Sequence, residues 1–227
     1  MGNSEYNIII FLFKNPVAVS VGSSTACAID SLGITCWGYL DGFSARGTPY
    51  NPPSSTFKSL SNPRTLSHGR FGDRTCVIDD MGVKCMRTRS FEEWEELNTP
   101  ELVNPSFINV STHTTCAIDR TGLNCWLGNG YYTYDSTELK NFQNFKEYIP
   151  NLVNPTQVVG GMSGACALDS KGVHCWSYRG PYKSVPTLKK PSILGDYYQV
   201  FQPVCVLDDD EVICWKNFHE ESHFFPL

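Results

Sequence analysis

The stretch Cys27-Ala-Ile-Asp30-Ser-Leu-Gly33-Ile-Thr-Cys36-Trp37 is the most informative part of the sequence, because related stretches follow it four more times along the chain. In every copy the second cysteine comes nine residues after the first. An Asp stands three residues after the first cysteine in each copy, and a Gly stands three residues before the second in all copies but the last. Five copies at periods of 39 to 50 residues indicate a repeat protein.

Each copy is typical of a β-hairpin that turns between the Asp and the Gly. If Asp30 and Gly33 flank a two-residue turn, Cys27 lies directly opposite Cys36. Directly opposed residues of antiparallel strands have Cα atoms about 4.5–5.5 Å apart, which a disulfide can span. A bulged turn at Gly33 would shift this register by one residue and make the contact diagonal. We favour the directly opposed register.

The ten cysteines therefore predict one disulfide in each hairpin. The expected pairs are Cys27–Cys36, Cys76–Cys85, Cys116–Cys125, Cys166–Cys175 and Cys205–Cys214. Ten buried, reduced thiols are one alternative, and metal ligation is another, although the short Cys-x2–4-Cys spacing of zinc sites does not occur. Five disulfides need an oxidising compartment, so we expect a secreted or periplasmic protein.

A second landmark precedes the hairpins by 12 to 14 residues. It reads Asn15-Pro16, Asn62-Pro63, Asn104-Pro105 and Asn154-Pro155, with Gly195-Asp196 in the fifth copy. The residues that follow it, such as 17–21, are Val-rich and predict a strand. The expected units are 15–61, 62–103, 104–153, 154–195, and 196–227 together with 1–14.

One strand and one hairpin per unit predict an all-β fold, a single five-bladed β-propeller over residues 1–227. The last unit is followed by too few residues for a full connection, whereas the N-terminus supplies an apolar run from Ile8 to Phe13. We expect this N-terminal strand to join the last blade and close the ring.

The unit Cys-Ala-Ile/Leu-Asp-x-x-Gly-x-x-Cys-Trp, after an extended Val-rich segment, resembles the cysteine-paired bacterial repeats of the regulator of chromosome condensation (RCC1-like) family. A propeller inhibitor of β-lactamases is a relative. The resemblance covers nearly the whole chain through its hairpins and implies a propeller fold. It also suggests a protein-interaction or inhibitor role.

Composition excludes several kinds of partner. The chain has 18 Lys and Arg against 23 Asp and Glu, a net charge of −5, which disfavours nucleic acid. It has no apolar run of the roughly 18 residues that a membrane span needs. The repeated Asp residues are expected to form turns, and the Trp after most second cysteines is expected to pack between blades. We expect no cofactor, no metal and a monomer.

The segments between each second cysteine and the next landmark vary most, so we expect binding to occur there. The candidate residues are Tyr39, Trp94, Tyr131, Tyr132 and Tyr134. Exposed aromatic side chains suit a protein surface or a sugar ring. The predicted function is a non-enzymatic protein-interaction or inhibitor module, with a glycan-binding lectin or adhesin as the alternative.

The variable segments also predict two helices. One spans 137–149, and a short acidic one spans 90–97 with Ser90 and Glu93 as its capping box. Asp208-Asp209-Asp210 is a weak candidate for calcium because it offers too few oxygen ligands. Asn109-Val-Ser111 is a glycosylation sequon that lies in a predicted strand.

Overall fold

The computed structural model describes most of the repeat region of the chain. The described residues are 13–22, 25–30, 33–38, 49–50, 60–69, 74–88, 94–112, 114–127, 143, 145–160, 164–182, 185–195 and 203–216.

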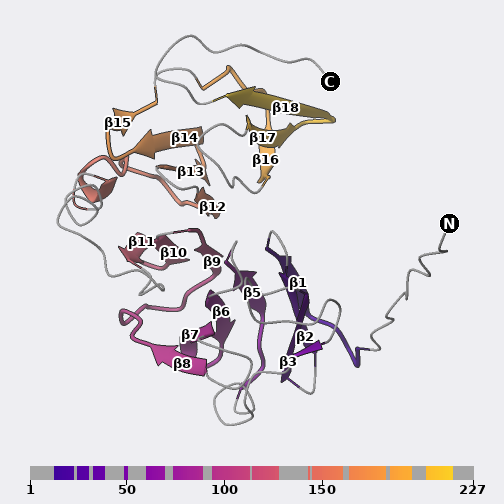
Figure 1. The fold of residues 1–227 in the computed structure, drawn as a ribbon. Coiled ribbons are helices and arrows are strands. Elements are labelled where there is room, and N and C mark those ends of the chain that lie inside the picture. Colours follow the sequence, from indigo (N-terminus) through magenta and orange to yellow (C-terminus); the bar gives the residue numbers. More distant parts are fainter. Residues whose placement is uncertain are drawn as a thin grey trace, which may run out of the picture.

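The chain forms five antiparallel β-sheets, one for each repeat (Figure 1). The first contains β1 (Ala18–Val21), β2 (Thr25–Asp30), β3 (Gly33–Gly38) and β4 (Pro49–Tyr50), and the second contains β5 (Thr65–His68), β6 (Arg74–Asp79), β7 (Gly82–Thr88) and β8 (Trp94–Leu97). The third contains β9 (Phe107–Val110), β10 (Thr114–Asp119) and β11 (Gly122–Leu127), and the fourth contains β12 (Gln157–Gly160), β13 (Gly164–Asp169), β14 (Gly172–Ser177) and β15 (Gly180–Pro181). The fifth contains β16 (Pro191–Leu194), β17 (Pro203–Asp208) and β18 (Glu211–Lys216). The all-β prediction, with one strand and one hairpin per repeat, is confirmed.

The hairpins have the directly opposed register. Cys27 pairs with Cys36 and Asp30 with Gly33, and the other four hairpins align in the same way. All five predicted disulfides are present, with Cα atoms 4.0–4.1 Å apart. In four copies the turn glycine has a φ between 116° and 130°, which side chains rarely adopt. The fifth copy lacks this glycine, and Asp209 takes a φ of 59° instead.

The Asn-Pro landmark marks the entry to each inner strand. Asn15, Asn62, Asn104 and Asn154 have φ between 50° and 54°, a left-handed conformation that Asn tolerates better than most residues. A proline after them disfavours the right-handed helical alternative. The fifth sheet differs from the expectation, because its inner strand β16 begins at Pro191, before the predicted unit boundary at 196. Gly195-Asp196 is therefore not the equivalent landmark.

Neighbouring sheets pack on each other through two different faces. The cysteine face carries both half-cystines, and the tryptophan face carries the residue that follows the second cysteine, because side chains alternate along a strand. Between the first two sheets, the cysteine face with Ile29 packs against Leu66 and Met86 of the next tryptophan face. The next three boundaries repeat this arrangement, the last one around Trp215. The predicted packing role of this position between blades is confirmed at all four boundaries.

Polar side chains also join neighbouring inner strands. Ser20 Oγ accepts a hydrogen bond from His68 N at 2.9 Å, and Ser67 Oγ accepts one from Val110 N at 2.8 Å. Asn109 Oδ1 accepts one from Gly160 N at 2.9 Å. At the last boundary, Gln157 Oε1 accepts one from Leu194 N, also at 2.9 Å. Each sheet is thus held to the next by apolar packing and by at least one such side-chain bond.

The five sheets follow one another around an arc, and the first and fifth lie on either side of an opening (Figure 1). Residues 8–12 of the predicted closing strand lie outside the described residues, so closure of the ring by this strand stays a prediction. No helix in the described part of the chain has the length and hydropathy that crossing a bilayer takes.

The two helix predictions have different outcomes. Residues 94–97 form strand β8, so a helix over 90–97 is wrong there. Strand β8 pairs with β7, where Glu95 forms an ion pair with Arg87, and this tertiary pairing overrides the local helical pattern. Residues 145–147 are helical, as expected. Phe145 is buried there, with its ring 5.7 Å from that of Trp176.

Candidate functional site

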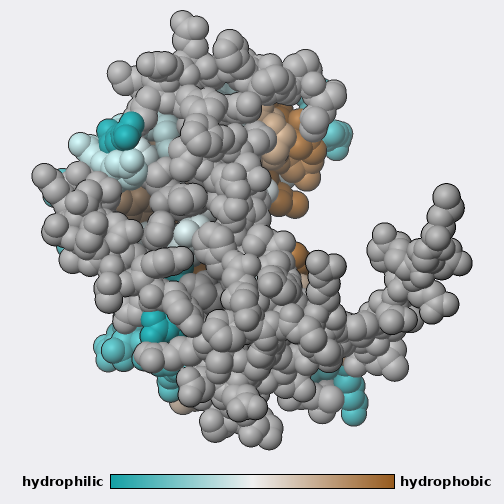
Figure 2. All heavy atoms as spheres, in the orientation of Figure 1, coloured by the Kyte–Doolittle hydropathy of each residue, from teal (hydrophilic) through white to brown (hydrophobic). Residues whose placement is uncertain are grey.

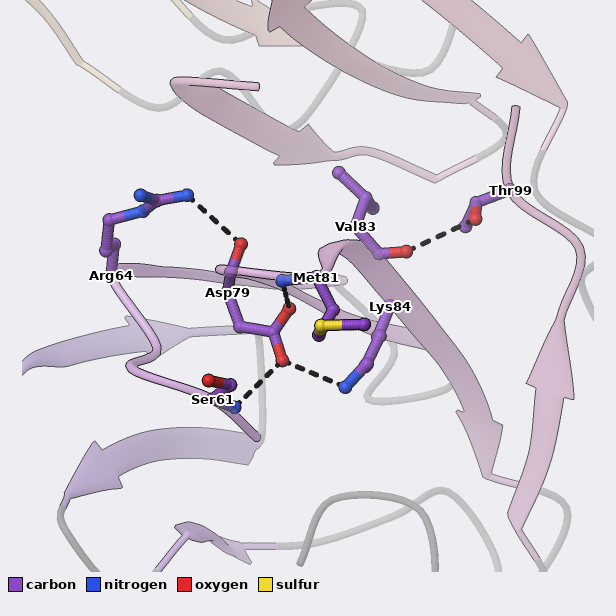
Figure 3. A network of polar contacts seen from close by, with 7 residues as sticks. All are labelled: Ser61, Arg64, Asp79, Met81, Val83, Lys84 and Thr99. Carbon is purple, nitrogen blue, oxygen red and sulfur yellow. Dashed lines mark hydrogen bonds and ion pairs between the residues drawn. The ribbon is translucent and has the colours of Figure 1, made fainter. Parts of the chain in front are cut away.

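The repeated Asp residues clamp each hairpin turn to the segment that enters the same sheet. Asp79 Oδ1 accepts from Met81 N at 2.8 Å, and Asp79 Oδ2 accepts from Ser61 N at 3.1 Å (Figure 3). Lys84 Nζ lies 2.9 Å from the same Oδ2, and Arg64 donates to the Asp79 carbonyl. One carboxylate thus fixes two separate pieces of backbone.

The other copies keep this clamp. Asp119 and Asp169 each accept from the backbone two residues ahead and from the entry segment, at Val103 N and Val153 N. For Asp79, Asp119 and Asp169, burial acts to raise the pKa, but the donated hydrogen bonds outweigh it and leave each pKa below its usual value. The repeated carboxylates are structural, as the sequence analysis predicts.

A crevice of about 640 Å³ lies beside the hairpin turn of the fourth sheet. One wall is the turn from Asp169 to Val173, and the other is the segment from Val185 to Pro191 that enters the fifth sheet. Val173, Val185 and Leu188 also pack into the core between these two sheets, so the base of the crevice is anchored. Its volume lies within the range of ligand-binding clefts.

Three lysines give the crevice a positive charge in a chain of net charge −5. Lys171, Lys189 and Lys190 are exposed, whereas Asp169, the one acidic lining residue, has a fully buried side chain. The Asp169 carboxylate is occupied by backbone N–H groups and by His174. Lys189 Nζ lies 3.8 Å from an exposed carboxylate of Glu211. No carboxylate of the described residues lies within ion-pair distance of Lys171 or Lys190.

The position of two of these lysines is fixed by the clamp of the fifth copy. Asp208 is buried, and its two carboxylate oxygens accept from Lys189 N at 2.9 Å and Lys190 N at 2.5 Å. The adjacent Pro191 is followed by a register shift before Ile193. The backbone that carries the lysines is therefore held in place while their ammonium groups face solvent. Asp208 acts here as a clamp, and within the described chain no group of three His, Cys, Asp or Glu side chains is arranged to hold a metal ion.

Two buried basic residues connect sheets rather than form a site. His68 is 2% exposed and lies within 2.7–2.8 Å of the hydroxyls of Thr25 and Thr75, and burial lowers its pKa to about 4. Arg74 is fully buried and donates to the carbonyls of Ser111 and Thr112 at the third sheet. Neither side chain is accessible to a ligand.

The aromatic candidates from the sequence fall outside what the structure describes. Tyr39, Tyr131, Tyr132 and Tyr134 lie among residues that are not described, and for Trp94 only the backbone, in β8, is described. Their binding role stays a prediction. The lysine crevice was not predicted from the sequence, although Lys189-Lys190 directly before Pro191 is a signal that could have pointed to it.

The Asn109 and Ser111 residues of the sequon contribute to the packing between the third and fourth sheets. Asn109 Oδ1 bonds to the backbone of the fourth sheet, and Ser111 is buried. A Cβ on Gly160 would lie 2.9 Å from Ser111 Cβ and 3.2 Å from Asn109 Oδ1, so the two inner strands are closely packed here.

No family model and no curated protein sequence matches this chain. Solved propeller structures do match. Yeast RCC1 (Prp20), in its complex with Kap60, superposes with a TM-score of 0.61 at 13% identity, over 88% of this chain and 56% of that one. Prp20p from Saccharomyces cerevisiae in a second structure gives a TM-score of 0.57 at 13% identity, over 88% and 57%.

The match extends to a receptor ectodomain. The CRINKLY WD40 ectodomain of the Arabidopsis thaliana receptor kinase ACR4 gives a TM-score of 0.51 at 16% identity, over 88% of this chain and 65% of that one. The chain spans a little over half to about two thirds of these structures. The resemblance of the repeats to RCC1 is confirmed in the fold, and the chain has the blade architecture of a β-propeller.

Proposed function

We propose that this protein is an extracytoplasmic, non-enzymatic protein-interaction module that binds an acidic segment of its partner in the lysine-lined crevice. The observation that carries the proposal is the crevice itself, in which Lys171, Lys189 and Lys190 surround a concave surface. The lining carboxylate of Asp169 is turned inward and fully bonded, so an incoming anion meets mainly ammonium groups.

The fold neighbours support a protein partner. One Prp20p structure is described with its binding properties to Gsp1p and histones, and the other is bound to Kap60. The five disulfides support an oxidising, extracytoplasmic location, because thiols in the cytosol are kept reduced. The glycan-binding alternative depends on tyrosines outside the described residues and stays a prediction.

Direct binding to a labelled peptide of six glutamates tests the charge preference of the crevice. We expect saturable binding that weakens as salt rises from 20 to 200 mM, because exposed charges are increasingly screened. The double variant Lys171→Glu/Lys190→Glu should bind at least tenfold more weakly. Arg120→Glu/Lys146→Glu removes the same total charge elsewhere and should keep its affinity. Equal losses in both variants would contradict a local site.

Affinity capture tests the biological partner. The wild type and the two double variants are used as baits in extracts of the native surroundings, followed by crosslinking and mass spectrometry. We expect a partner that is retained by the wild type and the Arg120/Lys146 variant and lost by the Lys171/Lys190 variant, with crosslinks at the lysines. Failure to recover any saturable partner would overturn the proposed function.

A further inference from the structure

The disulfide of the first sheet lies against a histidine of the second sheet. His68 is 2% exposed, and its Nδ1 lies 3.3 Å from Cys27 Sγ. The hydroxyl of Thr25 lies 2.7 Å from Nε2 and that of Thr75 lies 2.8 Å from Nδ1. Because both ring nitrogens have partners, the imidazole is fixed with one nitrogen beside the sulfur atom, across the boundary between the two sheets.

The same position in the next two sheets carries no titratable group. The strand register makes Val110 and Gly160 the equivalents of His68 in the third and fourth sheets. Val110 packs in the apolar cluster that contains Cys76 and Cys85. The disulfide of the second sheet thus has an aliphatic neighbour where the disulfide of the first has an imidazole.

Burial allows these disulfides to be compared with one another. The half-cystines of the first three sheets are at most 7% exposed. Cys205 and Cys214 are only half-buried, in the fifth sheet, whose apolar surface lies beside the opening in Figure 2. The second and third disulfides are therefore the matched references for the first, because exposure does not separate them.

The imidazole favours reduced Cys27 over the disulfide. A disulfide sulfur is uncharged and accepts only weak hydrogen bonds. Reduced Cys27 can give its proton to His68 Nδ1, either as a hydrogen bond or by transfer, which leaves a thiolate paired with an imidazolium. Reduced Cys76 would gain no such interaction from Val110, and apolar surroundings disfavour a thiolate.

We propose that Cys27–Cys36 is a redox-responsive disulfide, which a dithiol opens while the disulfides of the second and third sheets stay closed. A thiolate of the dithiol attacks Cys36 Sγ, the Cys27–Cys36 bond breaks, and its electron pair leaves with Cys27 beside His68. The second thiol of the reductant then displaces Cys36 from the mixed disulfide. Two electrons and two protons pass to the cysteines, and the dithiol becomes a disulfide.

His68 is a positioning residue in this reaction, because it stabilises the leaving sulfur and forms no bond with the dithiol. Its backbone N–H also donates to Ser20 Oγ of the first sheet. Opening the disulfide therefore changes the surroundings of a residue that joins the first two sheets. This inference is independent of the proposed function, because it concerns the first boundary and not the lysine-lined crevice.

Redox titration with mixtures of reduced and oxidised dithiothreitol tests the proposal. Samples are quenched with acid, free thiols are alkylated under denaturing conditions, and peptide mass spectrometry measures the reduced fraction of each pair. In the wild type, Cys27–Cys36 should be half reduced at a ratio of reduced to oxidised dithiol about tenfold lower than the second and third disulfides need, or about 30 mV. Equal midpoints would overturn the proposal without recourse to any variant.

Substitution of His68 separates this chemical role from a structural one. His68→Val introduces the side chain that the third sheet has at this position, and His68→Gln keeps polar atoms but cannot take up a proton. Both should make Cys27–Cys36 harder to reduce and bring its midpoint within about threefold of the second disulfide. If His68 only packed the boundary, its loss would loosen the hairpin and make the same disulfide easier to reduce. Easier or unchanged reduction in these variants would overturn the proposal.

Val110→Ala is the matched control, because it alters the equivalent position beside the second disulfide. It should leave the midpoint of Cys27–Cys36 as in the wild type. If it made Cys27–Cys36 as hard to reduce as the His68 variants do, the effect would not come from the imidazole and the proposal would be wrong.

Discussion

Asn109 Oδ1 accepts a hydrogen bond from Gly160 N at 2.9 Å and thereby joins the inner strands of the third and fourth sheets. The bond lies within a close approach of the two backbones, since a Cβ at residue 160 would meet Ser111 Cβ at 2.9 Å. The Asn109 hydrogen bond and the small size of Gly160 thus both contribute to the packing of the third sheet on the fourth.

Replacing Asn109 with Ala should lower the free energy of unfolding by about 1–2 kcal/mol, because a buried N–H loses its acceptor. Urea unfolding followed by tryptophan fluorescence measures the change. Gly160→Ala should be destabilising for a different reason, the steric contact with Ser111. If both variants unfold like the wild type, the close approach of the two strands is wrong.

The adjacent residues Asp79 and Asp80 provide a matched pair for the turn clamp. Asp79→Ala should cost about 2–3 kcal/mol, since it leaves the part-buried N–H groups of Ser61 and Met81, and the ammonium of Lys84, without their acceptor. Asp80→Ala should change stability by less than about 0.5 kcal/mol, because its ion pair with Arg64 is exposed. If the two variants lose the same free energy of unfolding in a denaturation experiment, the Asp79 clamp stabilises the protein no more than the exposed Asp80 ion pair does.

Stability should fall in two steps as the pH is lowered. The pKa of His68 is lowered to about 4 by burial, so between pH 6.5 and 4 the unfolded chain binds a proton that the folded chain does not. The loss from this group approaches about 3 kcal/mol at pH 4. His68→Gln should flatten this part of the profile. A steep slope that persists without His68 would contradict the assignment.

The second step belongs to the clamping carboxylates. The pKa values of Asp79, Asp119 and Asp169 are below the usual value despite burial, because hydrogen bonds favour the charged form. Their stabilisation is complete above the unfolded pKa near 3.8 and is lost as the pH falls through the lower folded values. The urea concentration at which half of the wild-type protein unfolds should therefore keep falling as the pH is lowered below 4. A flat profile below pH 4 would contradict depressed carboxylate pKa values.

The hairpins were predictable because all their information is local. The nine-residue spacing and the flanking Asp and Gly determine that Cys27 faces Cys36. Strand β8 was missed because its pairing with β7 depends on tertiary contacts that a local helical pattern does not reveal. The start of β16 was missed because Lys190-Pro191, and not Asn-Pro, marks it. Asp208 clamps the entry segment there, as the equivalent Asp residues do in the other sheets.

The crevice could not be predicted because its walls come from two different repeats. The turn at Lys171 and the segment at Lys189 are brought together only when the fourth and fifth sheets pack. The aromatic candidates were chosen from variable segments, most of which lie outside the described residues. Local patterns therefore predicted the scaffold of each blade but not the surface between blades.

Peptide mapping of the unreduced protein by mass spectrometry tests whether every repeat is a hairpin closed by its own disulfide. We expect alkylation to find no free thiol and each linked peptide to join cysteines nine residues apart, as in Cys27–Cys36. Free thiols in the oxidised protein, or linkages between cysteines of different repeats, would contradict it.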